Sequence, residues 1–104
     1  MPEVRIQIVE FLSWDQPGFV AATLTDVDDV AHTFHDKVPI FTDAALYPDT
    51  ELPVLGTLAC TVLEVLKRDG RELIRVDTEK PFDVESTKGW YHFVVAPDAL
   101  TSTF

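Results

Sequence analysis

Apolar and polar residues alternate along the first part of the chain, from Val4 to Leu12. The apolar positions are first even and then, after a slip of one residue, odd: Val4, Ile6, Ile8, Val9, Phe11. A period of two is typical of a β-strand. The slip predicts a bulge or a bend at which the strand changes neighbours. Turn-forming residues between Ser13 and Gly18 end this first strand.

Two further stretches predict a β-hairpin. Phe19 to Thr25 is the second strand, and Val30 to Phe41 the third, joined by the polar turn Asp26-Val27-Asp28-Asp29. Pro39 interrupts the third strand, because proline cannot donate a hydrogen bond within a sheet. It therefore marks a bulge, an edge, or the point at which the strand leaves one sheet for another.

Residues 42–55 have little periodicity and contain Pro48 and Pro53. We interpret them as a surface connection, with one helical turn starting at Asp43 to Leu46 and capped by Thr42 or Asp43. A connection of this length in a small domain is a candidate for a binding loop or a mobile flap.

The second half of the sequence predicts three more strands. Gly56 to Lys67 is a long apolar strand, Asp69-Gly70 is a hairpin turn, and Glu72 to Thr78 is the return strand. Residues 79–89 form another connection, whose Phe82 and Val84 we expect to fill an open end of the fold. Trp90 to Val95 is the last strand.

These elements predict a single all-β domain spanning residues 1–104. The expected architecture is a small antiparallel barrel of six or seven strands, OB-like or SH3-like, or a short sandwich. At most one short helical turn is expected. The long strands with a change of phase favour the barrel, but periodicity does not separate these topologies.

The charge narrows the range of partners. The chain has eight Lys and Arg against 18 Asp and Glu, a formal charge of −10, and residues 1–50 carry −7 of it. A negative potential repels nucleic-acid phosphates and anionic membrane surfaces. We therefore expect no nucleic acid and no membrane as partner, and favour a basic protein.

Cys60 is the only cysteine, so no internal disulfide is possible. No apolar run approaches the roughly 20 residues that span a bilayer. The start Met1-Pro2-Glu3 lacks the basic region of a signal peptide. From these features we expect a cytoplasmic protein.

The densest group of ionisable residues lies between His32 and Lys37. Alternation along a strand places His32 and Asp36 on the face of Phe34, and His35 on the other face. His32 and Asp36 are therefore a candidate pocket pair. The alternative is an Asp36 that pairs with a base from another strand or accepts backbone N–H bonds. A zinc site from the two histidines is not expected, because their side chains diverge.

Other candidate residues point to interaction and not to catalysis. Asp28 and Asp29 belong to an acidic turn without the pattern of an EF-hand loop. Trp14, beside a turn, is a candidate interaction residue. We interpret Cys60 as an inert small hydrophobic residue. The sequence has neither a glycine elbow around a serine nor a phosphate-binding loop. We expect no enzyme, no metal and no cofactor.

Three functional hypotheses follow. The first is an acidic binding domain for a protein with a basic surface, such as an immunity-type or inhibitor protein that masks a basic active site. The second is a small-molecule-binding barrel or a weak enzyme that uses His32 and Asp36 under the 43–55 loop. The third is a structural subunit that self-associates through an edge strand. The chain is accordingly expected to be a monomer or an edge-strand homodimer.

Overall fold

The fold consists of two antiparallel sheets, described here for residues 1–15 and 18–101 of a computed structural model. One sheet has the strand order β3-β2-β1-β4: β1 Glu3–Ser13, β2 Phe19–Thr25, β3 Ala31–Lys37 and β4 Val54–Ala59. The other has the order β5-β6-β7: β5 Thr61–Arg68, β6 Arg71–Asp77 and β7 His92–Val95. A helical turn, α1 (Val38–Phe41), and a 3₁₀ turn, η1 (Pro97–Ala99), complete the fold.

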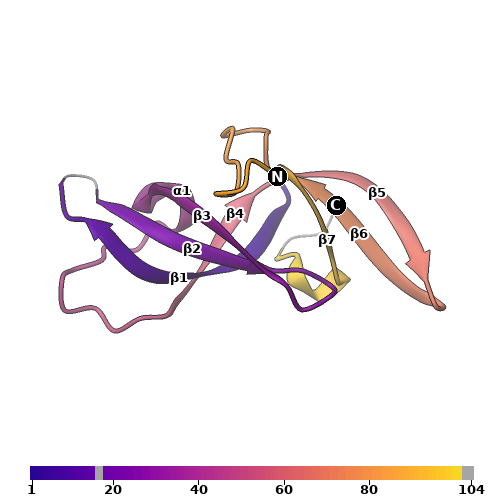
Figure 1. The fold of residues 1–104 in the computed structure, drawn as a ribbon, viewed down its shortest axis with the longest axis horizontal. Coiled ribbons are helices and arrows are strands. Elements are labelled where there is room, and N and C mark those ends of the chain that lie inside the picture. The colour runs from indigo at the N-terminus through magenta and orange to yellow at the C-terminus, as the bar shows by residue number, and fades with distance from the viewer. Residues whose placement is uncertain (16–17, 102–104) are drawn as a thin grey trace.

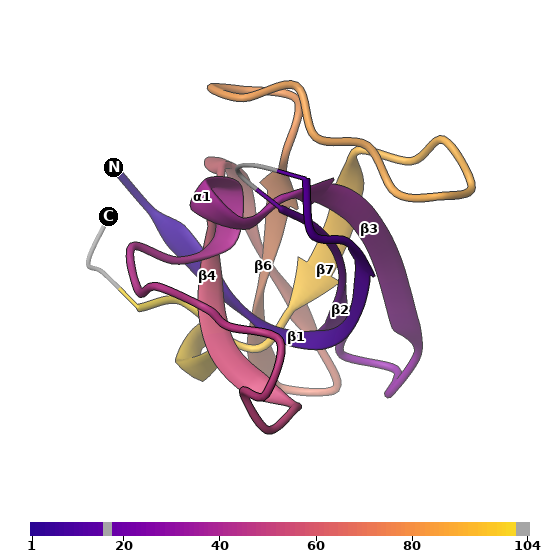
Figure 2. The same cartoon turned by 90° about the vertical axis from the view of Figure 1, so that its left-hand side faces the viewer.

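The all-β, antiparallel prediction is confirmed, but the strands do not close into a barrel. They are divided between the four-stranded and the three-stranded sheet, and the molecule is elongated, with extents of 45 × 26 × 24 Å (Figures 1 and 2). The β5–β6 hairpin extends away from the four-stranded sheet at one end (Figure 1). The finer prediction of an OB-like or SH3-like barrel is therefore not confirmed, because the two sheets do not form a closed barrel.

Cys60 is where the chain passes from one sheet to the other. The single strand expected from Gly56 to Lys67 was wrong, because β4 pairs with β1 and β5 pairs with β6. Between them, the N–H group of Cys60 donates to the carbonyl of Pro2 at 3.0 Å, and its side chain is fully buried. The apolar pattern continues across the break, although Leu63 and Val65 of β5 are exposed and only Val62 of that strand packs against the core.

That core joins the inward faces of both sheets with the buried side of α1. Buried side chains alternate with more exposed ones along the first part of β1 and along β3 and β7, as a period of two requires. Its members are Val4, Ile6, Ile8, Val20, Ala22, Leu24, Phe34, Val38, Phe41, Leu58, Cys60, Ile74, Val76, Val84, Phe93 and Val95. The register of β1 with β2 shifts between Ile8 and Glu10, which confirms the predicted bulge.

The helical turn α1 replaces the end of the expected third strand. Pro39 lies in its first turn, where the missing N–H costs nothing. The carbonyl of Gly18 accepts from the N–H of Val38 at 3.1 Å, and the carbonyl of Val38 accepts from the N–H of Thr42 at 3.1 Å. The helical turn is therefore at residues 38–41, and the prediction at Asp43 to Leu46 was wrong.

Gly56 allows α1 to lie against β4. A Cβ atom at this position would be 2.6 Å from the carbonyl oxygen of Phe41 and 3.0 Å from Cδ1 of Ile6. Both are shorter than any ordinary van der Waals contact. A residue without a side chain is therefore required at the place where the backbone of the helical turn approaches the strand.

The second hairpin and the following connection match the sequence in part. Asp69 and Gly70 both have positive φ, as the predicted two-residue turn needs. In the 78–91 connection, Val84 is buried in the core as expected. Phe82 is 53% exposed, so the prediction that it fills the core was wrong. The buried hydroxyl of Thr78 donates to the carbonyl of Val84 at 2.6 Å and holds this connection in place.

Replacement of Gly56 by alanine tests the contact between α1 and β4. We expect Gly56→Ala to lower the free energy of unfolding by about 1–3 kcal/mol, because the backbone of Phe41 must move away from the new methyl group. Urea denaturation measures this change. Leu55→Ala is the matched control, since that neighbouring side chain is 71% exposed and its loss should have little effect. Equal stability of Gly56→Ala and the wild type would contradict the contact.

Candidate functional site

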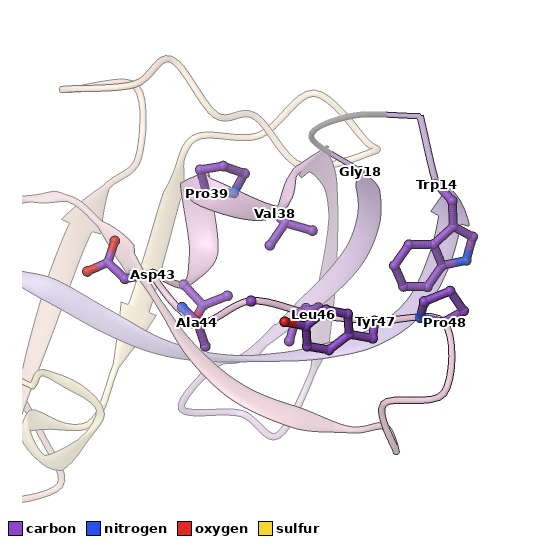
Figure 3. A pocket seen from close by; sticks show the side chains of 11 residues that line it. Trp14, Gly18, Val38, Pro39, Asp43, Ala44, Leu46, Tyr47 and Pro48 are labelled. Carbon is purple, nitrogen blue, oxygen red and sulfur yellow. The ribbon is translucent and has the colours of Figure 1, made fainter.

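A hollow of about 560 Å³ lies between Trp14 and Gly18, α1 and the first half of the 42–53 connection. Its lining is mostly apolar: Trp14, Gly18, Val38, Pro39, Thr42, Asp43, Ala44, Ala45, Leu46, Tyr47 and Pro48. Figure 3 shows the rings of Trp14, Tyr47 and Pro48 at one end of the hollow and the carboxylate of Asp43 at the other. We refer to it below as the Trp14 hollow.

Trp14 is held at the hollow by the end of β1. Its ring lies 4.0 Å from that of Phe11, at a tilt of 35°. The Ser13 hydroxyl accepts a bond from the N–H of Asp15 at 3.2 Å, which shapes the backbone just after the indole. Trp14 remains 40% exposed, so one face packs on the strand and the other is available to a ligand.

The opposite wall is the loop from Thr42 to Thr50, and two side-chain bonds shape it. The Thr42 hydroxyl accepts from the N–H of Ala44 at 3.0 Å, and the Thr50 hydroxyl accepts from the N–H of Tyr47 at 2.9 Å. Such threonine turns occur where a chain reverses without regular structure. They place Leu46 and Tyr47 beside the hollow, and Tyr47 is 61% exposed.

The hollow is acidic at its rim. Asp43 is the only charged residue among the described lining. Two further carboxylates are next to lining residues in the chain: Asp15 follows Trp14, and Asp49 follows Pro48. The base Lys37 is next to the lining residue Val38. Three carboxylates against one ammonium group give this end of the molecule a negative potential.

A smaller hollow of about 210 Å³ adjoins the first. It shares Pro39, Thr42 and Asp43 with the Trp14 hollow and adds the carboxylate of Glu3 and the ring of Phe82. Oε2 of Glu3 accepts from the Thr57 hydroxyl at 3.0 Å, which fixes that carboxylate at the surface of β1. We call this second depression the Glu3 hollow. The two share one wall, at Thr42 and Asp43.

His32 has a carboxylate partner, but it is Asp26 and not Asp36. Nε2 of His32 lies 2.7 Å from Oδ2 of Asp26, and His32 is only 9% exposed. The imidazole packs against the rings of Phe93 and Trp90, at 4.8 and 5.7 Å between centroids. A depression of about 110 Å³ over His32 is lined by the 86–90 segment and β3, away from the 43–55 loop.

Asp26 organises the β2–β3 turn. Its Oδ1 accepts from the N–H groups of Asp28 and Val30, at 2.8 and 3.0 Å. Burial raises the pKa of the Asp26 carboxyl, but the bonds from His32 and from these backbone groups lower it by more, so its pKa lies below the usual range. The sequence carries a signal for this role of Asp26, because an aspartate at the first position of a tight turn commonly accepts hydrogen bonds from backbone N–H groups that follow it.

The other predicted site residues do not meet at one place. Asp36 accepts a hydrogen bond from the backbone N–H of Lys37 at 2.7 Å, which matches the alternative that its carboxylate binds backbone N–H groups. Asp28 forms an ion pair with Arg68 of β5 at 2.7 Å, and Asp29 is exposed with φ of 64°. These two lie at the opposite end of β2 from Trp14. Of the five predicted residues, only Trp14 lines the large hollow.

Burial raises the pKa of the Cys60 thiol to about 11, with further contributions from the Glu3 and Asp77 carboxylates. The Cys60 thiol is therefore protonated near neutral pH and buried away from solvent, which agrees with its interpretation as an unreactive core residue. Across residues 1–15 and 18–101, no three side chains of His, Cys, Asp or Glu are grouped as a metal site. In that same part of the chain, no helix is long and apolar enough to cross a membrane.

Asp26→Asn tests the role of the turn carboxylate. A pKa below the usual range means that ionised Asp26 stabilises the fold above the ordinary aspartate pKa, and that this stability is lost as the pH falls through the folded-state value. We expect Asp26→Asn to cost about 1–3 kcal/mol at neutral pH and clearly less near pH 3. Urea unfolding at both pH values measures the difference.

The matched control for that measurement is Asp29→Asn. Asp29 lies in the same turn, and asparagine tolerates its positive φ. We expect this variant to track the wild type at both pH values. A loss in Asp26→Asn that is the same at neutral and at acid pH would show that the charge of Asp26 contributes nothing.

No family model, curated protein or solved structure matches this chain. The functional argument therefore rests on the shape and charge of the two adjoining hollows. They combine an apolar lining that carries two partly exposed aromatic rings with two carboxylates. This combination suits a ligand that has an apolar part and a positive charge.

Proposed function

We propose that this chain is a protein-binding domain whose Trp14 and Glu3 hollows bind a basic segment of a partner protein. The observation that carries the proposal is the continuity of an aromatic hollow with an acidic one across Asp43. The larger hollow receives an apolar or aromatic side chain of the partner. A neighbouring Lys or Arg of the partner reaches the carboxylates of Asp43 and Glu3.

The size and lining of the Trp14 hollow support this function. Binding pockets usually enclose about 300–1,000 Å³ and are mainly apolar with a few polar groups, and this one encloses about 560 Å³. Trp and Tyr are among the residues that contribute most to protein interfaces. Trp14 and Tyr47 are both partly exposed here, so a partner can bury them on binding.

The charge distribution supports a basic partner. No Lys, Arg or His is among the described residues that line either hollow. With a chain charge of −10, a basic protein approaches this end at an increased rate, and salt screens that attraction. In the Glu3 hollow, the exposed ring of Phe82 offers a face on which a guanidinium group can stack.

The lining residues support binding more than catalysis. No His, Cys or Ser side chain is among the described residues of the two hollows. His32, which lies beside the Asp26 carboxylate, is outside both hollows and packs at the β2–β3 turn. We therefore include no reaction step in the proposed function.

Selection from a random peptide-display library tests the proposal without a known partner. We expect enriched peptides to combine an aromatic or large aliphatic residue with a nearby Lys or Arg. Their affinity should fall by about tenfold or more in Tyr47→Ala and in Asp43→Lys. Isothermal titration calorimetry with the best peptide, at low and high salt, measures these losses.

Trp90→Ala is the matched control for the aromatic substitution. Trp90 is 51% exposed and belongs to the 78–91 connection, outside both hollows. Affinity should be unchanged in this variant. Enrichment of acidic peptides, or peptides whose affinity depends on Trp90 and not on Tyr47, would refute the proposed site.

A further inference from the structure

We propose that two copies of this chain pair antiparallel through β5, which extends the three-stranded sheet to six strands. This surface is separate from the hollows, so the inference stands or falls independently of the proposed function. It rests on four observations: an uncovered strand edge, exposed apolar side chains on that strand, a self-complementary charge pattern, and local charge neutrality.

Two of the four edge strands, β3 and β7, accept a backbone hydrogen bond from another segment, and among the described residues β5 does not. The edge of β3 is met at Thr33, whose carbonyl accepts the N–H of Thr87 at 2.8 Å. The edge of β7 is met at Val94, whose carbonyl accepts the N–H of Val27 at 2.9 Å. The fourth edge strand, β4, is shorter than β5, contains Gly56, and has α1 packed on its inward face at that glycine. In the described chain, β5 makes backbone ladder bonds only with β6.

The edge of β5 has the features of a pairing strand. It is eight residues long, contains no Pro or Gly, and lies on the outer side of the projecting hairpin (Figure 1). Leu63 is 43% exposed and Val65 is 48% exposed. Long apolar edges with open N–H and C=O groups recruit another strand unless something blocks them.

Symmetry restricts the register of the pairing, and the charges on β5 select one register. Two antiparallel copies in one sheet are related by a two-fold axis perpendicular to it, so one residue lies opposite its own copy. The ladder with β6 shows that Glu64, Leu66 and Arg68 share a face. With Leu66 opposite Leu66 of the second copy, Glu64 lies opposite Arg68, and Arg68 opposite Glu64.

Both charged residues have capacity for this second contact. Glu64 uses Oε1 for Arg75 at 3.1 Å, and Arg68 uses one terminal nitrogen for Asp28 at 2.7 Å. Glu64 is 53% exposed and Arg68 is 45% exposed. Opposite charges on directly paired residues stabilise a sheet, whereas like charges there oppose pairing.

The hairpin also lacks the charge that would keep two copies apart. Its residues 61–77 contain four bases and four acids, although the chain carries −10 in total: Lys67, Arg68, Arg71 and Arg75 against Glu64, Asp69, Glu72 and Asp77. Like-charge repulsion is therefore weakest where the edge is open. The acidic end with the hollows faces the opposite way along the molecule (Figure 1).

Sedimentation velocity over about a hundredfold range of protein concentration tests the pairing. The wild type should shift from monomer to dimer as the concentration rises. Glu64→Arg and Arg68→Glu should each dimerise about tenfold more weakly, because each homodimer then contains two like-charge contacts. An equimolar mixture of the two variants should regain the dimer, since all its contacts are again between opposite charges.

The mixture controls for effects within one chain, because each variant keeps the same intrachain contacts alone and mixed. Lys80→Glu controls for net charge: it changes the charge as Arg68→Glu does, but lies in the 78–91 connection, and it should dimerise like the wild type. A wild type that stays monomeric throughout, single variants that dimerise like the wild type, or a mixture that stays as monomeric as its parts would each overturn the proposal.

Discussion

The close approach of α1 to β4 is the constraint on which the binding end of this molecule depends. A single helical turn has too few hydrogen bonds to be stable alone. It is kept by the bond from Val38 to the carbonyl of Gly18 on one side and by contact with Gly56 on the other. The Trp14 hollow and the Glu3 hollow both have Pro39 in their walls. Without this turn, neither hollow would have its shape.

The strands with a clear period were predictable from the sequence. Phe19–Thr25 was placed to the residue, and the Asp69-Gly70 turn fixed the second hairpin, because local turn chemistry and alternation agree there. The prediction failed where the reason lies in tertiary structure. Cys60 continues an apolar pattern although the chain changes sheets there, and nothing local distinguishes that from one long strand.

The candidate site was less predictable than the fold. Trp14 was identified because an aromatic residue beside a turn has little reason to be buried. Leu46 and Tyr47 lie in a stretch without periodicity, so their joint exposure to one hollow depends on how two distant loops meet. The expected pairing of His32 with Asp36 was not found, because the carboxylate beside His32 is that of Asp26. Strand alternation pointed to Asp36 alone, and only the folded β2–β3 turn brings Asp26 back to His32 of β3.

The elongated shape separates the two proposed surfaces. The hollows lie at one end of a molecule that is 45 Å long, and β5 lies towards the other end. An occupant of the hollows would therefore leave the edge strand free. A pair joined at β5 presents two binding sites, each made of a Trp14 hollow and a Glu3 hollow, so a partner with two basic segments would bind with avidity set by the spacing of those segments. The paired domains would then bind a partner with two basic segments more tightly than a partner of equal charge with only one such segment.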